Sequence, residues 1–116
     1  IVDAIDSVPT KTELIRQAFM GSIPIISSMG AGKRNQAEKV CITTLAKTHN
    51  DGLSKSVRRS IANKDICNRL PVVFSSQEPM NQIEPESLTG IGSISYIPAT
   101  FGIYLAQYTI NFLLKN

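Results

Sequence analysis

The sequence predicts an α/β protein built on a parallel sheet, and its first third carries three observations that favour this class. Apolar residues fill four of positions 1–5, a helical period of apolar residues follows over 10–20, and a second short apolar run occupies 23–28. This strand–helix–strand order is typical of a right-handed βαβ unit with parallel strands. In open sheets of that kind, ligands lie beyond the carboxyl ends of the strands.

Both predicted strands end in residues suited to such an edge. Asp3 and Asp6 close the first run, and the small-residue loop 30–32 follows the second. The chain also opens directly on its first strand. Because a buried central strand needs partners on both sides, we expect the chain to be the second part of a larger α/β domain.

The helix over 10–20 is bounded by Pro9 before it and Gly21 after it, which are typical start and stop residues. Its apolar positions fall on one face, as helical spacing requires: Leu14, Ile15, Ala18 and Phe19. The strand over 23–28 carries Pro24 near its start, where proline is tolerated.

The middle of the chain predicts a strand over 40–45, a helix over 53–63 and a strand over 70–75. Asp51 is placed to cap the helix. The apolar line of this helix is Leu53, Val57 and Ile61, and its basic residues face elsewhere. The polar segment 77–92, which contains proline and glycine, predicts a mobile loop.

The last element is a helix over 98–114 with Pro98 in its first turn. No charged residue lies between Glu86 and Lys115, so the segment is long enough to suggest a bilayer span. Polar side chains and Gly102 interrupt it, however. We therefore favour a buried helix in a core or a dimer interface and expect no stable membrane insertion.

The net charge of +3 hides an asymmetry. Positions 33–69 hold nine basic and three acidic residues, a net +6, and the rest of the chain carries −3. Such a segment is either the footprint of a polyanionic partner or a solvated helix face with its loops. Charge alone favours the second.

Two cysteines and one histidine exclude several classes of site. Cys41 and Cys67 lie far apart without C-x-x-C spacing, which favours two reduced thiols over a disulfide or a metal site. A lone His49 cannot build a histidine-based zinc site or a Ser-His-Asp triad within this chain.

Five segments carry a resemblance to a known family. They are Asp3-Ala-Ile-Asp-Ser7, Ser28-Met-Gly-Ala-Gly32, Leu45-Ala-Lys-Thr48, Val72-Val-Phe-Ser75 with Glu78-Pro79, and Gly92-Ser-Ile-Ser-Tyr-Ile-Pro98. In this order they resemble the ThiF/MoeB/HesA adenylating family, and within it the branch of tRNA threonylcarbamoyladenosine dehydratases. The resemblance runs over nearly the whole of 1–116 and implies the C-terminal part of a Rossmann-like sheet with flanking helices.

The resemblance implies ATP and Mg²⁺ as cofactors and adenylation of a carboxylate followed by cyclisation. It places Asp6 as the catalytic residue and the magnesium ligand, with Asp3, Ser7 and Lys11 beside the nucleotide. A carboxylate suits magnesium. From the residues alone, a turn and helix cap is the favoured role of Asp6 and Ser7, and Lys11 fits an exposed first-turn position. The family also implies a cytoplasmic homodimer.

The partner that the resemblance implies is tRNA. The residues we place at that contact are Lys33, Arg34, Lys55, Arg58 and Arg59, although Arg58 would equally suit a surface salt bridge. We expect no ATP turnover from this chain alone, because the glycine-rich nucleotide loop of the family has no counterpart in it.

The sequence departs from the family at several points. Ser7 stands where sulfur-carrier activators have Asn, and the zinc-binding cysteine pairs of those activators are absent, which favours the tRNA branch. Gln36-Ala37 replaces the usual Asp-Pro, and Gly52 stands where proline is common. Two alternatives remain open: an adenylyltransferase for a ubiquitin-like or sulfur-carrier protein, and a non-catalytic dimerisation remnant.

Overall fold

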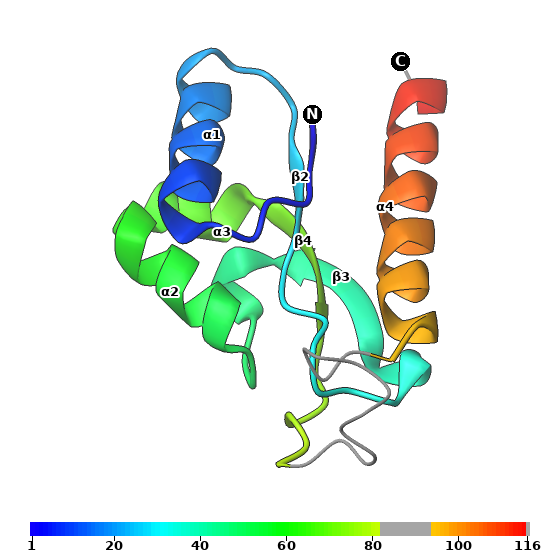
Figure 1. Ribbon diagram of the computed structural model, residues 1–116. Helices are drawn as coiled ribbons and strands as arrows, with labels where there is room; N and C mark the ends of the chain where they lie inside the picture. The colour runs from blue at the N-terminus through cyan, green and yellow to red at the C-terminus, as the bar shows by residue number, and fades with distance from the viewer. Residues whose placement is uncertain (82–93, 116) are drawn as a thin grey trace.

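The fold is a mixed four-stranded sheet with helices on both faces (Figure 1). A computed structural model of the chain describes residues 1–81 and 94–115. Within them, β1 (Val2–Asp3), β2 (Ile26–Ser28), β3 (Val40–Thr44) and β4 (Pro71–Ser75) form a sheet in the order β1-β2-β4-β3. β1, β2 and β4 run parallel, which confirms the predicted βαβ pairing.

β3 corrects the expectation of an all-parallel sheet. It pairs antiparallel with β4, with Val40 opposite Ser75 and Thr44 opposite Pro71. The start of β3 therefore lies at the same edge as the carboxyl ends of the other three strands. The sheet remains an α/β sheet, with an antiparallel strand at one margin.

Four α-helices flank the sheet in the described residues. α1 (Val8–Met20), α2 (Gly52–Ile61) and the short α3 (Lys64–Arg69) cover one face, and α4 (Tyr96–Lys115) covers the other (Figure 1). Two 3₁₀ turns, η1 (Ala37–Lys39) and η2 (Leu45–Lys47), flank β3. This two-sided cover gives the sheet one apolar core on each face.

β4 shows how strand alternation divides those two cores. Val72 and Phe74 belong to the core under α1–α3, and Val73 belongs to the core under α4. All three side chains are at most 2% exposed. β4 is thus buried on both faces, as a strand that reads as a continuous apolar run should be.

Helix α2 confirms the predicted apolar line. Val57 and Ile61 are buried, Leu53 is half-buried against the same core, and the Asp51 carboxylate accepts a hydrogen bond from the Ser54 N–H at 3.0 Å. The helix begins one residue earlier and ends two residues earlier than predicted. Ala62, in the left-handed conformation at φ 48°, turns the chain away after Ile61.

The other boundaries differ by a few residues. α1 begins at Val8, so Pro9 lies inside its first turn, where a proline costs no hydrogen bond. β1 and β2 are shorter than the runs 1–5 and 23–28 because only the paired residues form ladder bonds. The predicted loop 77–92 lies largely outside the described residues.

α4 matches the final predicted helix but begins two residues earlier and ends one residue later. Ile97, Phe101 and Leu105, spaced four apart, are buried against the sheet, so the core interpretation is confirmed for this face. Several large apolar side chains of α4 remain exposed: Ile103, Ile110, Leu113 and Leu114. Among the described residues, no helix is long and apolar enough to cross a membrane.

Candidate functional site

The carboxyl edge of β1 is built around a buried ion pair between Asp3 and Lys11. The Lys11 ammonium lies 2.9 Å from Asp3 Oδ2, and both side chains are fully buried. Lys11 Nζ also donates to the Ile5 carbonyl at 2.9 Å, and Asp3 accepts from the Ser27 hydroxyl and from the Ile5 N–H. Such pairs fix local geometry because neither charge can leave its partner without a large desolvation cost.

Lys11 is therefore not the exposed first-turn residue that the sequence alone would suggest. Lys11 and Asp3 are both buried and pair with each other. In the described residues their charged atoms face each other rather than a surface. They tie β1, α1 and β2 together at the turn 4–7. Contact of either side chain with a nucleotide stays a prediction.

Asp6 and Ser7 lie on that turn and are exposed. Within the described residues, the Asp6 carboxylate makes no hydrogen bond and no ion pair. Ser7 occupies the N-cap position of α1 but makes no side-chain cap bond; its hydroxyl is 3.4 Å from the Thr10 hydroxyl. Asp6 is therefore an open carboxylate presented by a rigid turn at the carboxyl edge of the sheet.

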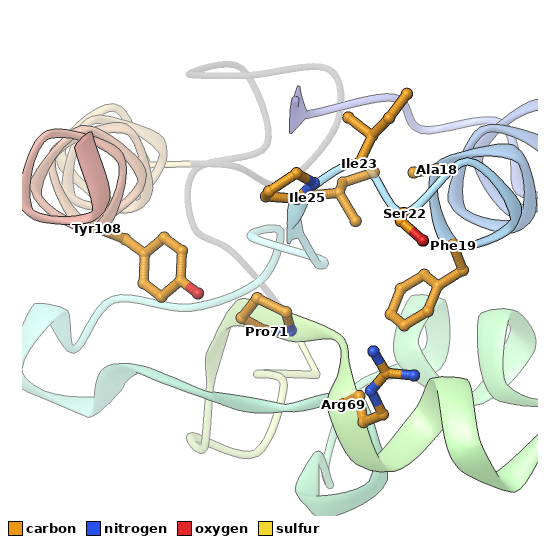
Figure 2. Close-up of a pocket in the computed structure, with 9 residues that line it drawn as sticks. Ala18, Phe19, Ser22, Ile23, Ile25, Arg69, Pro71 and Tyr108 are labelled. Atoms are coloured by element: carbon orange, nitrogen blue, oxygen red, sulfur yellow. The ribbon is translucent and has the colours of Figure 1, made fainter. Parts of the chain in front are cut away.

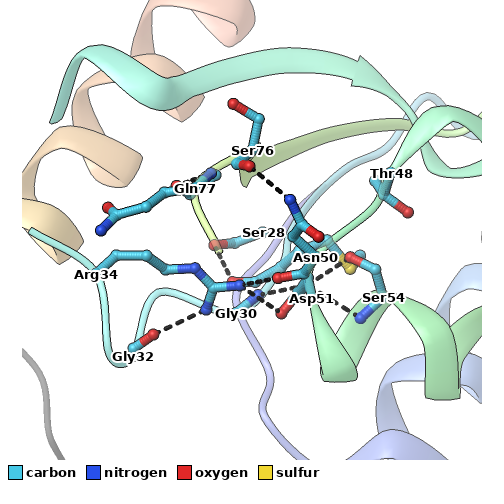
Figure 3. Close-up of polar contacts among 12 residues, drawn as sticks. Ser28, Gly30, Gly32, Arg34, Thr48, Asn50, Asp51, Ser54, Ser76 and Gln77 are labelled. Carbon is cyan, nitrogen blue, oxygen red and sulfur yellow. Dashed lines mark hydrogen bonds and ion pairs between the residues drawn. The ribbon is translucent and has the colours of Figure 1, made fainter. Parts of the chain in front are cut away.

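A second polar cluster holds the loop that follows β2 (Figure 3). Arg34 is only 4% exposed; its guanidinium donates to the Gly32 carbonyl at 2.8 Å and to the Asn50 carbonyl, and lies 3.6 Å from Asp51. The Asp51 carboxylate also accepts from the Gly30 N–H at 3.2 Å. Burial lowers the pKa of Arg34 from its ordinary value, and Asp51 opposes that shift.

Gly30 is needed here because its backbone lies against the Asp51 carboxylate. A Cβ at this position would overlap the Asp51 carboxylate. The tight loop predicted over 30–32 thus has a specific cause: the backbone comes within hydrogen-bonding reach of the residue that caps α2.

Further bonds connect this loop and Asn50 to the segment that follows β4, and connect the loop to α4. Gln77 accepts from the N–H groups of Asn35 and Gln36, Asn50 donates to the Ser76 carbonyl at 3.0 Å, and the Tyr96 hydroxyl donates to the Asn35 carbonyl at 2.7 Å. The edge of the sheet is therefore held by side-chain to backbone bonds over long sequence separations.

The basic residues placed at an RNA contact divide into three groups. Lys33, Lys55 and Arg59 are exposed, as that interpretation needs. Lys33 has φ 61°, an uncommon conformation for a residue with a side chain. Arg58 is half-buried and bonds Thr48 rather than forming a salt bridge. Arg34 is buried and bonds Gly32, Asn50 and Asp51 of the same chain, so it holds the loop together and does not lie on the surface.

The cysteine, histidine and acidic side chains of the described residues form no metal-binding cluster. No group of three or more His, Cys, Asp or Glu side chains there could hold a metal ion. Both cysteines are free thiols, as predicted, and burial raises the pKa of Cys41. His49 is exposed, and its ring packs edge-on against Phe74.

Known proteins with the same sequence pattern and fold are tRNA-modifying enzymes. The chain is 40% identical over 79 residues to tRNA threonylcarbamoyladenosine dehydratase 2 of Saccharomyces cerevisiae, an alignment of 68% of this chain and 18% of that protein. It is 26% identical over 130 residues to the Bacillus subtilis dehydratase, an alignment of 100% of this chain and 51% of that one. No model of a known protein family matches the chain.

Solved structures agree. The chain superposes on the Escherichia coli dehydratase TcdA in complex with AMP with a TM-score of 0.85 at 27% identity, over 98% of this chain and 47% of that one. The complex of the same enzyme with ATP gives 0.84 at 27% identity.

The chain fits the ThiF/MoeB family, and these relatives are tRNA threonylcarbamoyladenosine dehydratases.

The chain spans about half the length of the bacterial dehydratases that it matches. The family resemblance read from five motifs is thus confirmed. The sequence does not predict the Arg34–Asp51 cluster. It predicts Asp51 only as a helix cap, and no local spacing links Asp51 to Arg34, which lies seventeen positions earlier.

The dehydratase-like chain also has a cavity of about 330 Å³ at the opposite edge of the sheet (Figure 2). Phe19, Arg69 and Tyr108 are among its lining residues, and Arg69 lies over the Phe19 ring at 5.3 Å. The three parallel strands β1, β2 and β4 begin at this edge. The cavity is therefore separate from the site that contains Asp6 at the carboxyl edge.

Proposed function

We propose that this chain is part of an ATP-dependent tRNA threonylcarbamoyladenosine dehydratase. In this reaction the carboxylate of the modified base is adenylated, pyrophosphate leaves, and intramolecular attack then expels AMP and closes the ring. The observation that carries the proposal is the exposed Asp6, which has no partner among residues 1–81 and 94–115, on a turn fixed by the Asp3–Lys11 pair. Relatives crystallised with ATP and AMP support it.

Asp6 is the residue that we assign to Mg-ATP. Magnesium usually keeps several water ligands and binds through one or two carboxylates together with phosphate oxygens, so a single open carboxylate fits it. When bound, the ion would offset charge on the triphosphate. The chain's own contribution is to hold Asp6 in place and to keep the turn 4–7 from relaxing.

The rest of the activity depends on partners that we infer from the relatives. tRNA is the proposed substrate, and a homodimer is the proposed assembly. The exposed Lys33, Lys55 and Arg59 supply positive charge for RNA, whose backbone phosphates dominate affinity.

The test follows pyrophosphate release from Mg-ATP by the complete protein in which this chain occurs. It compares tRNA that carries threonylcarbamoyladenosine with unmodified tRNA. Release only with the modified tRNA, together with formation of the cyclic base, supports the proposal. Release that instead requires a small carrier protein would favour a carrier adenylyltransferase, and no release with either would favour a non-catalytic role.

Asp6→Ala tests the assignment of the site. Loss of one preorganised group that stabilises transition-state charge, such as an oxyanion-hole donor, typically costs about 10²–10³-fold in kcat. We expect a decrease of that order with unchanged thermal stability. Glu13→Ala is the matched control, because Glu13 is also an exposed carboxylate, in the middle of α1, and among the described residues its side chain bonds only Gln17. Equal activity of the two variants would remove Asp6 from the site.

A further inference from the structure

We propose that a cavity between α2, α3 and η2 binds a phosphate group of the RNA backbone. We call it the α2–α3 cavity; it measures about 530 Å³ and is lined by two alanines and by Arg58, Asn63, Lys64, Cys67 and Asn68. The inference rests on the proposed function for the identity of the RNA as tRNA. It adds a site that lies apart from the Asp6 turn.

Arg58 gives this cavity a fixed cation. Its Nη1 donates to the Thr48 carbonyl at 3.2 Å and to the Thr48 hydroxyl, and that hydroxyl in turn donates to the Leu45 carbonyl at 2.7 Å. The guanidinium is therefore anchored through one nitrogen. Nε and Nη2 make no hydrogen bond within the described residues. Their N–H groups are therefore available to donate to a phosphate, which the planar guanidinium binds through two parallel hydrogen bonds.

Lys64 adds a second positive charge on the opposite wall. It is exposed and has no ion pair among the described residues. The neighbouring acid, Asp65, is engaged at 2.9 Å by Arg69 and does not line the cavity. Two uncompensated cations therefore share one concave surface that no described carboxylate lines.

Amide groups complete the donor set. Asn63 uses its side-chain oxygen to accept from the Ile66 N–H at 3.0 Å, so its amide nitrogen remains available as a donor. Asn68 is exposed at the rim. The left-handed Ala62 bends the chain between α2 and α3, which brings these residues opposite Arg58.

A polymer fits this surface better than a free anion does. The outer face of α2 carries Lys55 and Arg59 one helical turn apart, both exposed, and Lys47 is exposed on η2. A backbone phosphate in the cavity would place adjacent phosphates along these cations. Phosphate contacts of this kind position an RNA without reading its sequence.

Cys67 makes the site measurable because its half-buried thiol lines the cavity. The complete protein is treated with iodoacetamide, which is uncharged, and the modification of each cysteine is followed by peptide mass spectrometry. We expect saturating tRNA to slow modification of Cys67 at least fivefold and to leave Cys41 unchanged.

Lys64→Gln tests the electrostatic half of the inference, with Lys39→Gln as the matched control. Lys39 is an equally exposed lysine outside the cavity, and its side chain has no partner among the described residues. Loss of one phosphate contact should lower the slope of log K against log salt concentration by about one. Lys64→Gln should show this change and lose the protection of Cys67, whereas Lys39→Gln should show neither.

Three outcomes would overturn the inference: tRNA does not protect Cys67, the two lysine variants behave alike, or inorganic phosphate at the same phosphate concentration protects as well as tRNA. The last outcome would indicate a small-anion site. The proposed function is scored separately by formation of the cyclic base. Dehydration without protection of Cys67 would refute only the cavity, and protection without dehydration would refute only the proposed reaction.

Discussion

The buried Asp3–Lys11 pair predicts a large loss of stability in Lys11→Met. Methionine keeps most of the apolar stem but removes the ammonium that lies 2.9 Å from Asp3 Oδ2. The Asp3 carboxylate would then remain fully buried with only the Ser27 hydroxyl and the Ile5 N–H as donors. Removing one partner of a buried pair typically costs about 3–5 kcal/mol.

The double variant Asp3→Leu/Lys11→Met gives the opposite expectation. Replacing both charges by apolar side chains of similar size is often neutral or stabilising by about 1–4 kcal/mol. The double variant should therefore be clearly more stable than Lys11→Met alone. A double-mutant cycle isolates this coupling, since the two residues touch and their effects are not additive.

The assay is urea unfolding of each variant, followed by far-UV circular dichroism at neutral pH. Lys55→Met is the control: Lys55 is exposed and unpaired among the described residues, so its replacement should stay within about 0.5 kcal/mol of the parent. The reasoning is refuted if Lys11→Met loses less than about 1 kcal/mol, or if the double variant is no more stable than that single variant.

Three further predictions follow from particular contacts. Gly30→Ala should lower stability by about 1–3 kcal/mol in thermal unfolding, because the new Cβ overlaps an Asp51 carboxylate that its donors hold in place; an unchanged melting temperature would contradict this. Asn63→Ala should cost about 1 kcal/mol and speed hydrogen exchange of the Ile66 N–H, because the cap of α3 is lost; unchanged exchange would argue against the cap. Burial raises the pKa of Cys41, so the contribution of its neutral thiol is fully present below the ordinary thiol pKa and declines as pH rises through the raised value. Urea midpoints measured from pH 7 to pH 10 should therefore fall more for the parent than for Cys41→Ala, and parallel curves would refute the shift.

The elements with a clear period could be predicted from the sequence. The helix around Val57 and Ile61 is long enough to show its apolar line, and the cap at Asp51 marks its start. α3 could not be found in this way because six residues are too few to show a helical period. The direction of β3 was also out of reach, since an apolar run does not specify whether its neighbour is parallel.

The candidate site was predicted only in part. Its position at the carboxyl edge followed from strand order, and the exposed Asp6 agrees with it. The burial of Arg34 and Lys11 did not follow, because a charged residue within a polar stretch normally indicates surface. Their acidic partners lie seventeen and eight positions away in the sequence, outside the helical spacings that reveal ion pairs.

The position of β4 in the sheet has a consequence for how the protein is made. β4 lies between β2 and β3, yet it follows both in the chain. While a ribosome is still synthesising residues before Pro71, β2 and β3 have no strand between them, and their inner edges stay unpaired. Because pairing must wait for these long-range contacts, we expect folding to be late, cooperative and slow compared with a helical bundle of the same length. A nascent chain that stalls before residue 75 would expose two unpaired strand edges, which are the surfaces on which chains aggregate.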